Sequence, residues 1–186
     1  MNAQMRIYTP LGSDGHELCH PVDPCDFEAI NVSIDGTPRQ SKWKQLTVRV
    51  VRNDGEKDLI ESDAPWLGVH ALIFRARAVE LMKPTLRTFG ELLPLKCSDA
   101  DLWIYNPGRL ADALDESASS VLRFKDGRLM LIQRHVFNAN AVRNVDVFKI
   151  PNLRVSPTFV GQRFVDRWHA SGLKGLEFKQ VWTSSN

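Results

Sequence analysis

The chain has 186 residues, of which 43% are hydrophobic and 25% are charged, and this balance excludes a largely disordered protein. Its 24 Lys and Arg residues nearly balance 22 Asp and Glu residues, and the formal charge of +2 gives no sign of a nucleic-acid-binding tail or an electrostatic membrane anchor. The length fits one domain of ordinary size, so we expect residues 1–186 to form a single domain with neither nucleic acid nor a membrane as a partner.

The N-terminus and the cysteines favour a cytoplasmic location. Residues 1–10 contain no apolar core of a signal peptide, and no apolar run approaches the roughly 18 residues that a membrane-spanning helix requires. The three cysteines, Cys19, Cys25 and Cys97, are odd in number and widely spaced, which argues against a disulfide framework. We therefore expect a protein of the reducing cytoplasm.

The first 26 residues predict a short strand followed by a loop. Residues 6–8 have the composition of a strand, and residues 9–26 are rich in Pro, Gly, Asp and His, which is typical of an exposed connection. Four side chains in this connection are of types that bind zinc: His16, Cys19, His20 and Cys25. Zinc usually takes ligands from two separated pairs, and here all four crowd into ten residues. We favour a polar loop without a cofactor, and keep a metal-dependent or hydrolytic enzyme that uses the His16–Cys25 cluster as the alternative.

The rest of the first half predicts strands and one helix. Residues 27–34 and 91–95 look extended, and apolar residues alternate with other residues along Leu46–Val51, which is typical of a half-buried strand. From Arg75 to Leu86 the apolar residues recur at helical spacing. Pro84 is expected to kink or end this helix, because proline lacks a backbone N–H and clashes with the preceding turn.

The second half carries clearer local signals. Asn106 and Pro107 predict the cap and first position of a short helix, and Asp126–Gly127 between two apolar runs predicts a hairpin. Ser156 followed by proline predicts the start of a longer helix, Pro157–Ser171, with an apolar stripe on one face. Together the elements predict an α+β fold: a mostly antiparallel sheet built from hairpins, with two or three packed helices.

The order of motifs from residue 62 to residue 182 resembles a bacterial immunity-protein family, whereas residues 1–61 resemble it only loosely. The residues that carry the resemblance include Tyr105-Asn106, Asp112-Ala-Leu-Asp115, Ser119, Arg123-Phe-Lys-Asp-Gly127, Val136-Phe137, Val147-Phe-Lys-Ile-Pro151, Phe159, Phe164-Val165, Gly172-Leu-Lys-Gly-Leu-Glu-Phe178 and Trp182. Members of this family lie beside polymorphic toxins, including effectors of contact-dependent and type VI secretion systems. The resemblance implies a protein that binds and neutralises one cognate toxin and catalyses no reaction.

Four residues are candidates for toxin contact: Trp43, Trp66, Asp112 and Glu116. Tight interfaces concentrate their binding energy in a few aromatic or arginine anchors, and residues that pack the core cannot serve. We rank the loop-borne Trp43 and Trp66 above Asp112 and Glu116, because the shared motifs of the second half look structural. Each residue also has a structural interpretation: a tryptophan at a sheet edge, a buried tryptophan, and a solvated acidic helix end.

Overall fold

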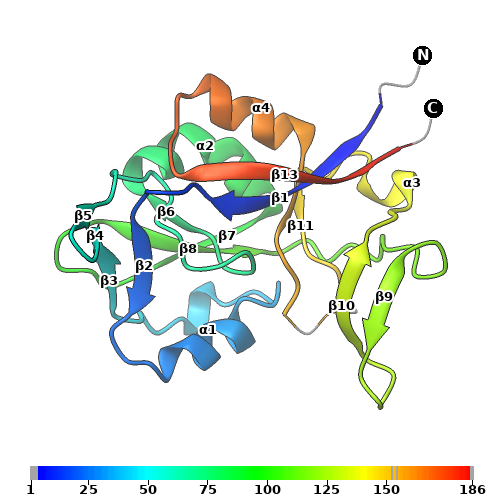
Figure 1. The fold of residues 1–186 in the computed structure, drawn as a ribbon, viewed down its shortest axis with the longest axis horizontal. Coiled ribbons are helices and arrows are strands. Elements are labelled where there is room, and N and C mark those ends of the chain that lie inside the picture. The colour runs from blue at the N-terminus through cyan, green and yellow to red at the C-terminus, as the bar shows by residue number, and fades with distance from the viewer. Residues whose placement is uncertain (1–3, 152, 154, 185–186) are drawn as a thin grey trace.

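Antiparallel pairing between distant segments organises the molecule (Figure 1). A computed structural model describes residues 4–151, 153 and 155–184. Its strands are β1 (Arg6–Gly12), β2 (Leu18–Pro21), β3 (Val48–Val51), β4 (Asn53–Asp54), β5 (Lys57–Asp58), β6 (Ile73–Arg75), β7 (Gly90–Pro94), β8 (Leu102–Pro107), β9 (Ser120–Arg123), β10 (Leu129–Arg134), β11 (Val147–Phe148), β12 (Phe159–Gly161) and β13 (Leu176–Thr183). Its helices are α1 (Asp26–Ser33), α2 (Ala76–Phe89), α3 (Ala139–Val142) and α4 (Gln162–Ala170), with a short 3-10 turn at Gln40–Lys42. These elements confirm the predicted α+β class.

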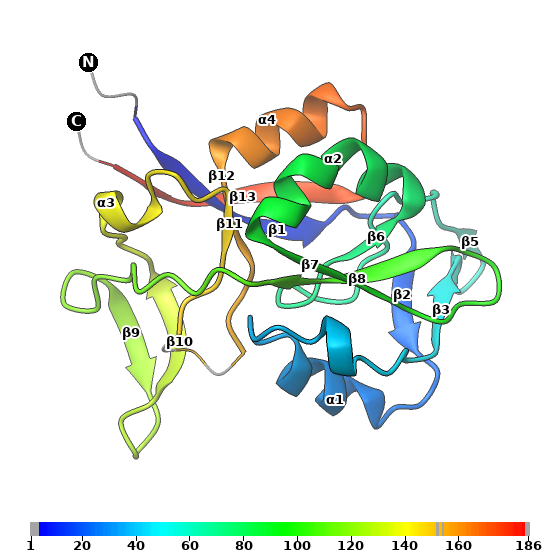
Figure 2. The ribbon, with the colours of Figure 1, turned by 180° about the vertical axis from the view of Figure 1, so that it is seen from behind.

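The largest sheet has the strand order β11-β12-β1-β13. Its inner strand β1 pairs with β13 along its whole length, from Arg6 opposite Thr183 to Gly12 opposite Leu176. Helix α4 packs on β1 and β12, while α2 contacts α4 and the second sheet, β6-β8-β7 (Figure 2). The two helices therefore cover neighbouring parts of both sheets. Within the described residues, no helix combines the length and the apolar character needed to cross a membrane.

Large aromatic side chains fill the core beneath the two helices. Trp168 and Phe164 of α4 are completely buried and stack with ring centroids 6.4 Å apart. Phe74 of β6 lies against Trp168, and Tyr105 of β8 donates a hydrogen bond to the carbonyl oxygen of Leu86 at 3.0 Å. The apolar stripe predicted from the sequence is therefore confirmed. Each such burial stabilises the fold by roughly 1.5–3 kcal/mol.

Helix α2 does not end at Pro84, so of the two predicted outcomes the end is contradicted, while the kink stays a prediction. The helix continues to Phe89, and its buried residues Ala78, Met82 and Leu86 keep a spacing of four across the proline. Pro84 itself is exposed. The buried stripe carries the helix past the proline, because Pro84 lies on the exposed face and the burial of the stripe outweighs the loss of one hydrogen bond.

The predicted extended run 27–34 is instead helix α1. Its buried side chains, Ile30 and Ile34, are four residues apart, which is a helical and not a strand spacing. Asp26 and Glu28 in the first turn favour the helix through its dipole. The preceding connection was also misjudged, because β2 lies inside it and pairs with β3.

Two predicted helix starts in the second half were wrong as well. Asn106 is fully buried in β8, where its side chain accepts a hydrogen bond from the Gly36 N–H at 2.9 Å and donates to Glu91 Oε1 at 2.9 Å. Ser156 does not cap a helix, since its hydroxyl accepts from the Ile150 N–H at 3.1 Å. The helix after it begins only at Gln162, beyond β12. Asn106 thus bonds backbone 70 residues away, whereas Ser156 bonds backbone six residues before it.

The predicted hairpin at Asp126–Gly127 is confirmed as β9 and β10, and Gly127 has a positive φ of 85° in its turn. Both views show this hairpin projecting away from the sheets and helices (Figures 1 and 2). We call residues 120–134 the arm. Its two strands form a sheet of their own, in which β9 and β10 pair only with each other among the described strands.

Candidate protein interface

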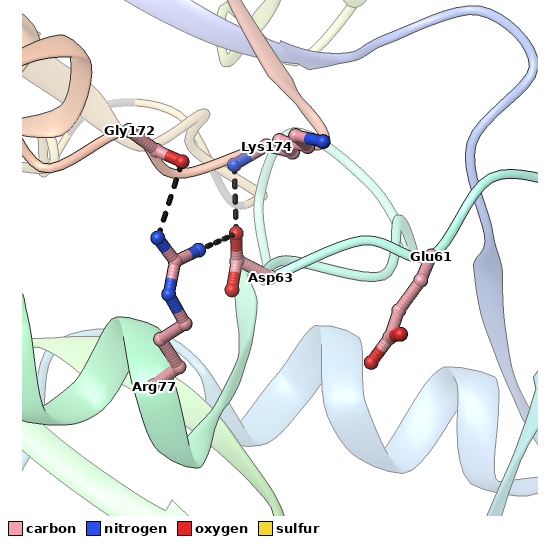
Figure 3. A pocket seen from close by; sticks show the side chains of 5 residues that line it. All are labelled: Glu61, Asp63, Arg77, Gly172 and Lys174. Atoms are coloured by element: carbon pink, nitrogen blue, oxygen red, sulfur yellow. Dashed lines mark hydrogen bonds and ion pairs between the residues drawn. The ribbon is translucent and has the colours of Figure 1, made fainter.

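A polar pocket of about 370 Å³ lies where the loop before β6 meets the N-terminus of α2 and the turn after α4 (Figure 3). Asp63 accepts hydrogen bonds from Arg77 Nη1 at 2.7 Å and from the Lys174 N–H at 2.8 Å. Arg77 also donates to the carbonyl oxygen of Gly172 at 3.3 Å. The carboxylate and the guanidinium are thus engaged in joining three segments of the fold, so the pocket is best explained as a structural latch.

A buried carboxylate stands close to this latch. Glu17 is 3% exposed, and its carboxylate lies 2.6 Å from Arg75 Nη2 and 3.2 Å from Arg52 Nε. It also accepts a hydrogen bond from the Ser62 N–H at 3.1 Å. The pair with Arg75, the last residue of β6, holds the N-terminal part of the chain against that strand. Removing either partner would leave a buried charge without its counter-ion. Nothing in the local sequence around Glu17 distinguishes it from a surface acid.

The four zinc-type residues do not form one ligand set. Cys19 is buried in β2, where burial raises the pKa of its thiol to about 12. Cys25 lies exposed immediately before α1, and His20 packs against Phe27 with ring centroids 6.1 Å apart. His16 Nδ1 lies 3.1 Å from the carbonyl oxygen of Asp14. Among the described residues there is no group of three or more His, Cys, Asp or Glu side chains that could hold a metal ion.

The two tryptophans predicted for toxin contact are both half-buried and make structural contacts. Trp43 packs against the core under β7, and its Nε1–H donates to the carbonyl oxygen of Pro94 at 2.8 Å. Trp66 packs beneath the α2–α4 core, so close to β1 that a Cβ added at Gly12 would lie 2.6 Å from Trp66 Cγ. Their toxin-binding role remains a prediction.

Asp112 and Glu116 do not lie on a helix end, because residues 108–116 form no helix. Ala111 and Ala113 are buried on either side of exposed Asp112, which is the alternation of an extended segment. Glu116 forms an ion pair with Arg123 at the base of the arm. Glu116 therefore lies beside the arm, and the toxin-binding role of both acids also remains a prediction.

The surface with the most exposed apolar side chains is the arm itself. Leu122, Phe124, Met130 and Leu131 are 43–51% exposed. A groove of about 870 Å³ runs beside them, with Phe124 and residues 128–131 on one wall and Pro151, Leu153, Val155 and Pro157 on the other. Successive strand residues point to opposite faces, so four consecutive lining residues mean that the groove follows the edge of β10 opposite β9. We call it the arm groove.

Basic side chains surround this apolar surface. The arm contains Arg123, Lys125, Arg128 and Arg134 against a single acid, Asp126. Arg128 pairs with Asp126 at 2.6 Å, and its guanidinium carbon lies 5.7 Å from the centre of the Phe124 ring. Lys125 is exposed and makes no hydrogen bond or ion pair to the described residues. The arm therefore carries exposed apolar side chains together with an excess of basic side chains, which we call its basic rim.

A buried lysine supports the second wall of the groove. Lys149 is 2% exposed, and its ammonium donates to the carbonyl oxygens of His70 at 2.7 Å and Ser156 at 2.9 Å. Burial lowers the pKa of Lys149 to about 7. Because Ser156 lies at the end of the loop that lines the groove, Lys149 fixes this loop to the core. No role was predicted for Lys149, which in the sequence is only one residue of Val147-Phe-Lys-Ile-Pro151.

The arm groove was not predicted either, although the sequence carries a signal for it. Leu129-Met-Leu-Ile132 is apolar at four successive positions, so both faces of β10 carry apolar residues. A two-stranded hairpin can bury only one face against its own protein. The excess apolar face therefore had to be exposed or covered by something else.

Comparison with protein-family models gives one match: residues 96–183 fit the model of an immunity protein family, Imm11. The matched segment includes the arm, both walls of the groove, α4 and β13. This finding confirms the resemblance to a bacterial immunity-protein family over the second half of the chain. No curated protein matches the chain.

Proposed function

Starting from the match of residues 96–183 to an immunity protein family, we propose that this protein binds and neutralises one cognate bacterial toxin. The family match is the observation that carries this proposal, and it favours a role by binding over a role in catalysis. The toxin partner is a member of a polymorphic toxin system, delivered by contact-dependent or type VI secretion. The neutralising complex forms in the cytoplasm of the protected cell.

The surface chemistry supports a binding role. An immunity protein must dissociate slowly, because a few free toxin molecules can harm the cell. Slow dissociation requires a cluster of apolar or aromatic side chains that becomes fully dry in the complex, ringed by polar contacts. The exposed apolar side chains of the arm and its basic rim have this composition.

The test is co-expression with the toxin domain encoded beside the gene. We expect the protein to restore growth to cells that produce this toxin domain, and to co-purify with it in a stoichiometric complex. A control uses the core variant Trp168→Ala, which is expected to be destabilised by the loss of a large buried side chain and so to give weaker protection. If the folded wild-type chain neither rescues growth nor binds the neighbouring toxin, the proposal is wrong.

A further inference from the structure

We propose that the arm groove is the docking site for the cognate toxin, which contributes apolar side chains surrounded by carboxylates. This inference rests on the proposed function and adds to it the surface and the chemistry of the partner. The arm projects from the body of the molecule, so a partner can reach both β10 and the loop across the groove (Figures 1 and 2). Neither wall is covered by another described segment, and Leu131 at its edge is 51% exposed.

The groove is held open by contacts that lie outside it. Across the groove from β10, the Lys149 ammonium binds the Ser156 carbonyl oxygen, and the Ser156 hydroxyl accepts from the Ile150 N–H. These bonds pin the second wall to the buried end of β11. A preformed site loses less conformational entropy on binding, so more of the contact energy appears as affinity.

The edge of β10 that lines the groove favours contact with side chains of a partner over pairing with an added strand. In the β9–β10 pairing, Leu129 lies opposite Arg123 and Leu131 lies opposite Leu122, which leaves Met130 as an extra residue. A second irregularity follows between Ile132 and Arg134. Irregularities of this kind interrupt the regular row of edge hydrogen-bond groups, and they discourage pairing with another strand. The toxin is therefore expected to insert side chains between β10 and the loop.

Charge determines what must surround these inserted side chains. The arm has four basic side chains and one acid, and Lys125 has no partner among the described residues. A toxin surface with carboxylates around an apolar centre would pair with this rim, and it would be attracted at long range. A basic or purely apolar toxin surface would leave Lys125 unpaired, since Arg123 and Arg128 already pair with Glu116 and Asp126.

The experiment measures binding of the neighbouring toxin domain to three variants of the full-length chain. Leu131→Asp places a carboxylate in the groove and is expected to raise the Kd by about 30-fold or more, the scale of a hot-spot residue. Val32→Asp is the matched control, because Val32 is also 51% exposed but lies on α1. Lys125→Glu is expected to lower the association rate constant roughly 3–10-fold at low salt and to leave the dissociation rate nearly unchanged.

Thermal unfolding of each variant separates loss of binding from loss of folding. If Leu131→Asp is folded and binds like Val32→Asp while wild type binds tightly, the docking site is wrong and the proposed function stands. A wild-type chain that binds no toxin overturns both. If sedimentation shows a wild-type dimer that Leu131→Asp dissociates without affecting toxin binding, the groove holds a second copy of this chain and the inference is wrong. Loss of binding in Trp43→Ala or Trp66→Ala alone, with both variants folded, would move the interface to the first half.

Discussion

The α4 core buries its large apolar side chains, whereas the arm exposes apolar side chains of similar type. Phe164 and Trp168 are completely buried beneath α4, whereas Phe124 and Met130 of the arm are each 47% exposed. Helix α4 has a sheet and a second helix to pack against, while the two-stranded arm has only one covered face. Apolar residue type alone therefore does not reveal which side chains stabilise the fold and which remain available to a partner. What decides whether an apolar side chain is buried is whether another sheet or helix of the fold packs over it.

The largest contrast is expected from truncating the α4 core. Trp168→Ala and Phe164→Ala should each lower the free energy of unfolding by roughly 3–5 kcal/mol, because they remove large buried side chains and leave cavities. Urea unfolding followed by tryptophan fluorescence or circular dichroism measures this. The arm control Met130→Ala should lie within about 0.5 kcal/mol of wild type. Comparable losses at Met130 and Trp168 would contradict the distinction between the two regions.

A pair of glycines sharpens the same comparison. Gly175 at the start of β13 has φ of 97°, and a methyl group there would overlap the hydroxyl of buried Ser62. Gly127 in the arm turn has φ of 85°, and nothing lies within 4 Å of an added Cβ. Gly127→Ala should cost about 1–2 kcal/mol from the left-handed backbone alone, and Gly175→Ala should cost about 1–3 kcal/mol more from overpacking. Equal melting temperatures for the two variants would show that the contact with Ser62 relaxes freely.

Lys149 holds the loop opposite the arm through its bonds to the carbonyl oxygens of His70 and Ser156, and its titration gives a pH-dependent test. Its folded-state pKa is about 7, well below that of an unfolded lysine, so above pH 7 the unfolded chain binds more protons. Stability should therefore rise as the pH increases from 7 to 9, by up to about 1.4 kcal/mol per pH unit, and the full penalty of the buried charge remains below pH 7. Lys149→Met should remove this slope. The raised pKa of Cys19 lowers stability from about pH 8.5 upward, where the unfolded thiol ionises, but it does so in both proteins, so the difference between their pH curves reports Lys149. Parallel pH curves for the two proteins would contradict the prediction.

The smallest change in stability is expected for a substitution in the arm groove, the proposed docking site. Leu131→Asp should change the free energy of unfolding by no more than about 0.5 kcal/mol, because the side chain is half exposed and makes no buried polar contact. Differential scanning calorimetry of this variant beside Val32→Asp measures the effect. A large loss of stability would mean that Leu131 belongs to the core of the arm.

Local signals predicted much of the fold. The stripe containing Phe164 and Trp168 and the Asp126–Gly127 turn depend on residues close in sequence, and the structure confirms both. Asn106 and Ser156 were misassigned because their side chains accept from backbone groups that lie outside the helices predicted to start at them, the Gly36 N–H and the Ile150 N–H. Pro84 was misjudged because the burial that carries α2 past it comes from other segments.

The candidate interface was harder to predict for a related reason. Trp43 and Trp66 attracted attention by residue type, yet each contacts its own protein, through Pro94 and Gly12 respectively. The exposed face of β10 could be recognised only by asking what covers a strand that is apolar on both sides. That question depends on the number of neighbouring layers, which is a property of the whole fold.

The pairing of β1 with β13 has a consequence for synthesis of the protein. Residues 6–12 are translated before their partner strand, residues 176–183. At ~5–20 residues per second, β1 waits roughly 10–40 s for this partner. During translation the nascent chain cannot close its largest sheet until residues 176–183 have left the ribosome. An unfinished chain would expose an unpaired strand edge, and this window is where chaperones would be needed.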